Sequence, residues 1–256
     1  MTIRGEALLE LFNARRGMVC AVGAGGKKST LYALADAHPG RHAITTTVFM
    51  AQFPDDLDGE IVVEGPGTLA ERVRTAGARR VAYACPGDKA GRHGAVPPEL
   101  VRRLHDECGF ETTFVKADGA RMRWIKAPRD DEPVLPPGPL ACVIPVLSAR
   151  VLGEPLSERI AHRLDRVMAV TGLREGETIR PAHLAALLTH PEGVLKGGGN
   201  APVVPVFNMV DDPERAAAAR QAAELALAHT DRFARVVLAT MRRIGDPIVE
   251  VVGEAP

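Results

Sequence analysis

The chain has 256 residues, of which 46% are hydrophobic, 4% aromatic and 25% charged, and 32 Lys and Arg residues balance 32 Asp and Glu residues. This size and composition suit one large α/β domain, or two small ones, with an aliphatic core. Because the net charge is zero, the sequence lacks the basic surplus with which proteins bind nucleic acid.

The sequence indicates a cytoplasmic protein. Its four cysteines stand apart without a C-x-x-C spacing, which is typical of buried free thiols in a reducing compartment. Charged residues interrupt the first leucines, so the N-terminus predicts an amphipathic helix rather than a signal peptide. No apolar run approaches the ~20 residues that a membrane-spanning helix needs. We therefore expect no membrane among the partners of this chain.

Apolar runs bounded by turn residues alternate with segments of helical spacing along the chain. Strands are predicted at residues 18–22, 42–47, 61–63, 81–85, 112–117, 141–147, 202–207, 235–239 and 248–252. Helices are predicted at residues 28–37, 68–78, 98–108, 157–169, 181–189 and 214–229. This alternation predicts a three-layer α/β fold, with a mostly parallel sheet and helices on both faces.

We expect the chain to form a single domain over residues 1–256. Prolines crowd one stretch and predict an extended surface segment near 127–139. A small helical insertion is expected near 150–200. In mostly parallel sheets, ligands bind outside the carboxyl ends of the strands. The polar residues of interest follow predicted strands, so we expect them to gather at that edge of the sheet.

The stretch from residue 18 to residue 31 predicts a phosphate-binding loop. An apolar strand is followed by a glycine-rich turn and then by a helix, which is the context of such loops. Glycines let backbone N–H groups face an anion, and a helix N-terminus adds partial positive charge. The residues expected to hold a nucleotide here are Gly23, Ala24, Gly25, Gly26, Lys27, Lys28, Ser29 and Thr30.

The loop departs from the standard patterns. Gly26 and Lys27 supply the central pair of G-x-x-x-x-G-K-[ST], but Ala21 occupies the first glycine position and Lys28 the hydroxyl position. The dinucleotide pattern G-x-G-x-x-G fits Gly23 and Gly25 but also meets Lys28 at its third glycine. A tight turn with surface lysines is the alternative without a ligand. The strand before the loop and the helix after it favour the phosphate site.

Three oxygen donors predict a Mg²⁺ site. Asp118 follows a predicted strand, in the place where nucleotide hydrolases hold a metal-side carboxylate. Ser29 behind the loop and Thr46 at the end of the second strand offer hydroxyls. The alternatives are an ordinary Asp-Gly turn at Asp118 and ordinary strand propensity for the threonine cluster 45–47.

Cationic residues follow Asp118 closely. We expect Arg121 to stabilise charge during phosphoryl transfer, with Lys27 and Asp118 as the other catalytic residues. Arg123 and Lys126 fit a solvated loop at least as well.

Asn208-Met209-Val210-Asp211 follows the predicted strand at 202–207. The run resembles the Asn-Lys-x-Asp element with which GTPases read guanine, with methionine in place of the lysine. We expect Asn208 and Asp211 to contact the base. The alternative is a plain helix start, because an aspartate followed by proline caps helices.

These elements, taken in order, resemble the YqeC family over about residues 18 to 211. The resemblance rests on Gly23-Ala24-Gly25-Gly26-Lys27, Thr45-Thr46-Thr47, Ala117-Asp118-Gly119-Ala120-Arg121, Lys126-Ala127-Pro128, Glu132-Pro133-Val134, His162-Arg163, His190-Pro191-Glu192-Gly193 and the Pro-Val-Phe-Asn-x-Val-Asp run. Members are described as accessory proteins of selenium-dependent molybdenum hydroxylases, which implies a P-loop NTPase fold and a role in cofactor maturation. The chain departs from the family at Lys28, Lys116 and Met209.

The resemblance implies Lys27 as the phosphate lysine, Asp118 as the metal-side carboxylate, and Asn208 and Asp211 as base contacts. We therefore expect a protein that binds ATP or GTP with Mg²⁺ and hydrolyses it during maturation of a metal cofactor. A molybdenum hydroxylase or a maturation protein is the expected partner. Two alternatives are a small-molecule kinase or ligase whose 190–200 loop closes on an acceptor, and a chaperone that binds a nucleotide or pterin nucleotide without turnover.

Overall fold

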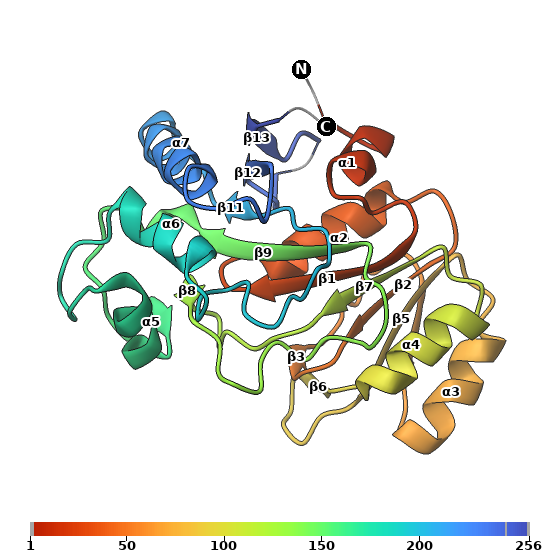
Figure 1. Ribbon diagram of the computed structural model, residues 1–256. Helices are drawn as coiled ribbons and strands as arrows, with labels where there is room; N and C mark the ends of the chain where they lie inside the picture. Colours follow the sequence, from red (N-terminus) through yellow and green to blue (C-terminus); the bar gives the residue numbers. More distant parts are fainter. Residues whose placement is uncertain (1–2, 244, 255–256) are drawn as a thin grey trace.

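A large, mostly parallel sheet forms the centre of the molecule in the computed structural model, which describes residues 3–243 and 245–254 (Figure 1). The strand order is β13-β12-β11-β9-β1-β7-β2-β5-β6-β3, and β4 pairs with β5. β13, β6 and β3 pair antiparallel with their neighbours, and the other pairs in this sheet are parallel. The mostly parallel α/β sheet predicted from the sequence is confirmed.

The strands of this sheet are β1 (Gly17–Gly23), β2 (His42–Thr46), β3 (Met50–Ala51), β4 (Glu60–Val63), β5 (Arg80–Pro86), β6 (Arg92–Gly94), β7 (Thr112–Lys116), β9 (Cys142–Ser148), β11 (Val206–Asn208), β12 (Arg235–Ala239) and β13 (Ile248–Gly253). The helices are α1 (Glu6–Leu11), α2 (Lys27–Ala37), α3 (Pro66–Thr75), α4 (Pro98–Glu107), the 3-10 turn η1 (Ala149–Val151), α5 (Leu164–Thr171), α6 (Pro181–Thr189) and α7 (Pro213–Leu227).

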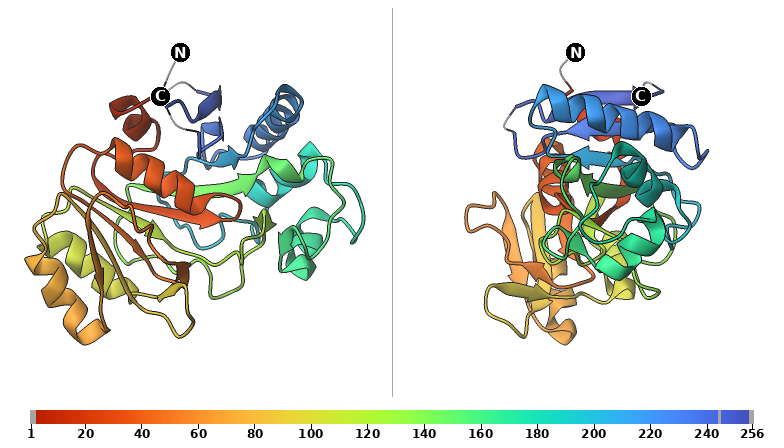
Figure 2. Two further views of the ribbon diagram at one scale, coloured as in Figure 1. Left: turned by 180° about the vertical axis from the view of Figure 1, so that it is seen from behind. Right: turned by 90° about the vertical axis from the view of Figure 1, so that its left-hand side faces the viewer.

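Helices cover both faces of the sheet, as Figure 2 shows from two sides. The central strand β1 makes this possible, because its side chains are apolar in both directions. Met18, Cys20 and Val22 enter the core beneath α3, α4, α6 and α7. Val19 and Ala21 enter the other core, beneath α1 and α2. The three-layer arrangement is therefore set by a continuous apolar run rather than by an alternating one.

The structure differs from the predicted elements where segments are short or interrupted. The helix predicted at 157–169 is confined to α5, because residues 161–162 form β10 (Ala161–His162), which pairs with β8 (Ile125–Lys126). Two-residue strands are too short to show a period in the sequence. The N-terminal helix ends at Leu11, so the arginines at 15 and 16 lie outside it.

The proline-rich segment 127–139 is not wholly a surface loop. Ala127, Pro128, Glu132 and Pro136 are buried in it, and the N–H of Val134 donates to the carbonyl of Ala117 at 2.9 Å. This segment thereby packs against the carboxyl end of β7. Along the described residues, no helix has the length and apolar character needed to cross a bilayer.

Candidate functional site

The predicted site residues gather where four neighbouring strands end. Loop 24–26 joins β1 to α2, and Asp118 follows β7 on one side of β1. On the other side, Ser148 ends β9 and Asn208 ends β11. Since these strands are parallel and adjacent, their carboxyl ends share one edge of the sheet. Motifs that are far apart in the sequence therefore lie together at this edge of the sheet.

Three glycines let the loop lie against the neighbouring strand ends. Gly23, Gly25 and Gly26 have φ values of +88°, +84° and +143°, a region that L side chains rarely adopt. A Cβ on Gly23 would meet the carbonyl oxygen of Val146, and one on Gly26 would meet the side-chain amide of Asn208. The loop is therefore packed against β9 and β11 by close backbone approach.

The amides of the loop divide into two groups. The N–H of Gly23 donates to Asp118 Oδ2 at 2.8 Å, and that of Ala24 donates to the carbonyl of Val146 at 2.7 Å. The following N–H groups, at residues 25–28, have no acceptor within the described residues. They form the N-terminus of α2, where unpaired amides and the helix dipole favour an anion. The loop therefore keeps donors available beyond those that the fold uses.

Gly25→Ala should destabilise the fold and remove anion binding. The new Cβ would lie 2.6 Å from Ser148 Cβ and 2.7 Å from the carbonyl oxygen of Trp124, so the loop must move. The matched control is Gly153→Ala, because Gly153 has a φ of +85° but open space at its Cβ. We expect the Gly25 variant to lose about 2 kcal/mol more than the control in urea unfolding. Equal losses would contradict the close packing of the loop.

Two buried lysines hold the carboxylate of Asp118. Lys27 Nζ lies 2.8 Å from Asp118 Oδ1 and also donates to the carbonyl of Gly23. Lys126 Nζ lies 2.9 Å from Asp118 Oδ2 and donates to the carbonyl of Gly119 at 2.7 Å. All three charged side chains are at most 5% exposed. Lys126 is therefore a buried member of the site and not part of a solvated loop.

The ion-pair network continues away from the loop. Lys126 Nζ lies 2.6 Å from Glu132 Oε2, and Arg163 donates to both oxygens of Glu132 at 2.6 and 3.0 Å. Arg163 adopts a positive φ of 63° at the start of α5, which places its guanidinium on this carboxylate. Lys116 Nζ donates to the carbonyls of Asp118 and Phe49 at 2.8 and 3.0 Å.

The network holds more positive than negative groups. Burial lowers the pKa of Lys27, although Asp118 opposes this shift. Burial also opposes ionisation of Asp118, but Lys27 and Lys126 together hold the pKa of this carboxyl below its ordinary value. Burial and the charge of Lys27 lower the pKa of Lys116 to about 7. The carboxylates of Asp118 and Glu132 face three basic side chains, those of Lys27, Lys126 and Arg163. This surplus of basic groups favours an anion at the adjoining amides.

The Glu132 pairs predict a sensitivity to acid. Burial opposes its ionisation, but Arg163 and Lys126 lower the pKa of Glu132 from 4.5 to about 2. Glu132 takes up a proton at a higher pH in the unfolded chain than in the folded protein. Its ion pairs therefore contribute their full stabilisation of the fold above about pH 4.5, and this stabilisation is lost as the pH falls toward 2. Allowing for screening by solvent, it amounts to about 1–2 kcal/mol. Glu132→Gln should flatten the slope of unfolding free energy against pH in this window, and an unchanged slope would contradict the pairing.

Two of the three predicted metal donors, Asp118 and Thr46, contact other groups of the protein in this structure. Both oxygens of Asp118 face ammonium groups. The hydroxyl of Thr46 donates to the carbonyls of Val48 and Lys116, at 2.7 and 3.1 Å. Oxygen donors of this kind suit Mg²⁺ in principle, but a cation beside Asp118 would meet two lysines. Within the described residues, no cluster of His, Cys, Asp and Glu forms a metal site.

Several predicted contacts serve the fold instead of facing the loop. Lys28 Nζ donates to the carbonyls of Ala51 and Gln52, at 3.3 and 3.1 Å, and so points away from Lys27. Thr30 is buried and bonds the carbonyl of Gly26. Arg121 is exposed, with a positive φ of 45°, on the segment that follows Asp118.

The two predicted base contacts lie beside the loop. Asn208 donates from Nδ2 to the carbonyl of Gly25 at 2.8 Å, and its Oδ1 accepts from the N–H of Met241 at 2.9 Å. Asp211 is half exposed, and its Oδ1 lies 3.3 Å from the hydroxyl of Thr240, which also contacts the carbonyl of Val210 at 2.9 Å. Asn208 therefore ties the loop to the segment after β12, which the sequence reading had not assigned to the site.

Sequence reasoning also did not assign Lys126, Glu132 and Arg163 to the site. A charged residue in an irregular segment resembles a solvated one until its partners are known. The resemblance to the family could have indicated these residues. The motifs that carry it include Lys126-Ala127-Pro128, Glu132-Pro133-Val134 and His162-Arg163. Long-range ion pairs join these three elements.

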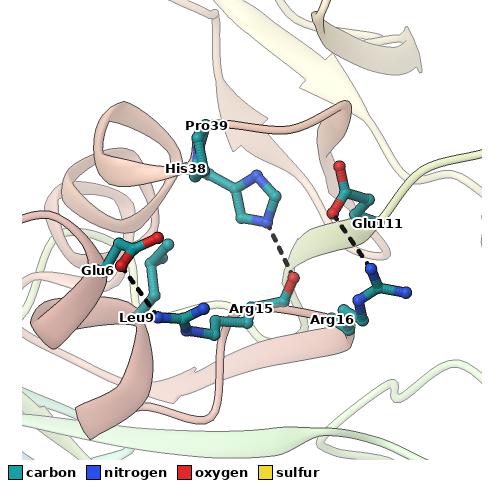
Figure 3. A pocket seen from close by; sticks show the side chains of 7 residues that line it. All are labelled: Glu6, Leu9, Arg15, Arg16, His38, Pro39 and Glu111. Carbon is teal, nitrogen blue, oxygen red and sulfur yellow. Dashed lines mark hydrogen bonds and ion pairs between the residues drawn. The ribbon is translucent and has the colours of Figure 1, made fainter.

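A separate pocket lies at the opposite edge of the sheet (Figure 3). It has a volume of about 130 Å³ and is lined by residues that precede β1 and β7 and that end α2. Arg15 lies 3.2 Å from Glu6, and Arg16 lies 4.0 Å from Glu111. The charged residues that line this pocket thus form ion pairs with each other. These pairs join segments that precede the strands, so we assign the pocket a structural role.

The fold and the site define a three-layer α/β protein whose glycine-rich loop joins the central strand to a helix. A family model described as YqeC protein matches residues 19–165, which include the loop, Asp118, Lys126 and Arg163. A protein of Escherichia coli (strain K12) named "Uncharacterized protein YqeC" is 30% identical over 186 residues, 71% of each chain. The chain belongs to the YqeC family, as its motifs predicted.

Proposed function

We propose that this protein binds the phosphates of ATP or GTP at residues 23–30 and acts in the maturation of a molybdenum- or selenium-containing enzyme. The observation that carries the proposal is the run of amides at residues 25–28 without acceptors among the described residues, beside a buried cluster with surplus positive charge. Such amides and a loop lysine are the groups with which proteins hold phosphates. Membership of the YqeC family supports the maturation role and a molybdenum hydroxylase or maturation protein as partner.

Lys27 has a defined task in the proposed complex. Its ammonium group exchanges Asp118 for phosphate oxygens, while Lys126 continues to neutralise Asp118. The exchange leaves no buried carboxylate without a cation, which limits its energetic cost. Arg121, an exposed residue three positions after Asp118, is the cation proposed to neutralise charge on the outer phosphates.

The pairing of Asp118 favours a second candidate function, the binding of a nucleotide or a nucleotide-bearing pterin without turnover. Before a nucleotide binds, both oxygens of Asp118 face lysines, so Mg²⁺ would enter with the nucleotide, whose phosphates supply oxygen ligands. When bound, the ion would neutralise charge on the β- and γ-phosphates. The structure therefore favours nucleotide binding that persists without Mg²⁺.

Calorimetry against ATP, GTP, inorganic tripolyphosphate and nucleotide-bearing pterins, with and without Mg²⁺, tests the proposal. We expect binding of a nucleotide and of tripolyphosphate in both conditions. If none of these ligands binds, the proposed function is wrong. Product analysis then separates the chemistries: bare phosphate indicates hydrolysis, a phosphorylated or adenylated small molecule indicates a kinase or ligase, and an unchanged nucleotide indicates a chaperone.

A further inference from the structure

A larger cavity lies against α2, one turn from the loop. Its volume is about 480 Å³, within the range of about 300–1,000 Å³ typical of small-molecule sites. Its walls come from α1, which lies beside α2 (Figure 2), from one face of α2, and from the segment between β12 and β13. The described lining residues are Arg4, Gly5, Leu8, Ser29, Tyr32, Ala33, Asp36, Ala37, Met241, Arg242, Arg243, Gly245 and Pro247.

The cavity begins where the candidate phosphate site ends. Ser29, which lines it, is the third residue of α2, and the helix starts at Lys27. The lining continues along the helix to Ala37, about 12 Å further at the usual rise per residue. The lining of the cavity therefore begins one residue after the amides at residues 25–28.

Asn208 connects the two parts physically. Its Nδ2 donates to the carbonyl of Gly25 in the loop, and its Oδ1 accepts from the N–H of Met241, a cavity residue. The hydroxyl of Thr240, the residue before Met241, donates to the carbonyl of Val210 at 2.9 Å and lies 3.3 Å from Asp211 Oδ1. The two residues predicted to read a base thus support the segment that borders the cavity. They act as positioning residues for it.

The lining has the character of a site for a flat, polar ring that belongs to an anionic molecule. Leu8, Met241 and Pro247 supply apolar surface, and Tyr32 supplies an aromatic ring with a buried hydroxyl that has no partner among the described residues. The lining also includes three arginines, Arg4, Arg242 and Arg243. Guanidinium planes stack on aromatic bases and attract anions. Asp36, the acidic lining residue, pairs with Arg80 at 2.8 Å and so does not cancel this charge.

We propose that this cavity holds the nucleoside of the bound nucleotide, with its base between Tyr32 and the described residues 241–243 and 245–247. The inference rests on the proposed function, because the phosphates of the same molecule lie at the loop. It assigns the base contacts to α2 and to residues 241–243 and 245–247, with Asn208 and Asp211 behind them.

A variant that fills the cavity separates the cavity's contribution to nucleotide affinity from that of the loop. Ala33→Trp places a large ring in the cavity, and Ala217→Trp makes the same change at an exposed position of α7. The ligands are ATP, GTP and inorganic tripolyphosphate, titrated by calorimetry. We expect Ala33→Trp to weaken the tighter nucleotide at least about tenfold and to leave tripolyphosphate within about twofold of the unmodified protein. Ala217→Trp should change neither.

The outcomes distinguish this inference from the function on which it rests. If the unmodified protein binds neither nucleotide nor tripolyphosphate, the proposed function fails and the inference with it. If it binds both and Ala33→Trp binds both equally well, the cavity is not the nucleoside site, while the loop assignment stands. If Ala33→Trp loses both ligands, the double variant Arg242→Ala, Arg243→Ala decides. A selective loss of nucleotide affinity in that variant supports the inference, and unchanged nucleotide affinity overturns it.

Discussion

Lys27→Ala should abolish tight nucleotide binding, with Kd rising by roughly 100-fold. Hydrogen bonds to charged groups contribute about 1.5–3 kcal/mol each, and every 1.4 kcal/mol is about tenfold in affinity. Lys27 lies at the end of the loop, where its ammonium group donates to the carbonyl of Gly23 and lies 2.8 Å from Asp118 Oδ1. Calorimetry with tripolyphosphate and with the tighter of ATP and GTP measures the loss.

The neighbouring lysine provides the matched control for this change. Lys28→Ala removes the same charge one residue later, but Lys28 Nζ bonds the carbonyls of Ala51 and Gln52. We expect it to weaken binding by less than about threefold. Unchanged affinity in Lys27→Ala, or equal losses in the two variants, would refute the assignment of Lys27 as the phosphate lysine.

Asp118→Asn should destabilise the fold by about 3–5 kcal/mol, because removing one partner leaves buried charges uncompensated. Asp118 lies between Lys27 and Lys126 and accepts the N–H of Gly23, so its loss sets two buried ammonium groups against each other. Urea unfolding measures the change. The combined variant Asp118→Asn, Lys126→Met should recover part of the loss, since it removes one of the uncompensated cations.

An exposed ion pair supplies the comparison for Asp118. Asp131→Asn breaks a surface pair with Arg129 at 2.7 Å and should have a much smaller effect, because water screens it. If Asp118→Asn were as mild as this control, the carboxylate would not be the centre of the buried network. A role limited to metal binding would then explain Asp118 better than the network does.

The sequence predicted the fold well where periodicity and turns were unambiguous. The apolar run before the loop became β1, Pro181–Thr189 was predicted to the residue as α6, and β12 was predicted with its exact bounds. Short pieces escaped prediction. β8 and β10 span two residues each, and their pairing depends on a tertiary contact between distant segments.

The site was predicted in part. Strand-loop-helix context located the loop and Lys27, and the Asp-Gly step after a strand located Asp118. The ion pairs around Asp118 were harder to predict, because Lys126 lies in a two-residue strand and Glu132 in the proline-rich segment 127–139, neither of which has a periodic pattern. Burial of their charges follows from packing against β7 and α5, which only the folded chain reveals. Asn208 was located, but its two bonds, to Gly25 and Met241, give it a supporting position.

The most direct test follows the backbone amides of Gly25, Gly26, Lys27 and Lys28 by nuclear magnetic resonance during titration with ATP, GTP or tripolyphosphate. If the loop holds the phosphates, these amides shift strongly and exchange more slowly with solvent, and all three ligands affect them alike. If a nucleotide binds while these four amides keep their free-state shifts and exchange rates, the phosphates lie elsewhere and the account is contradicted.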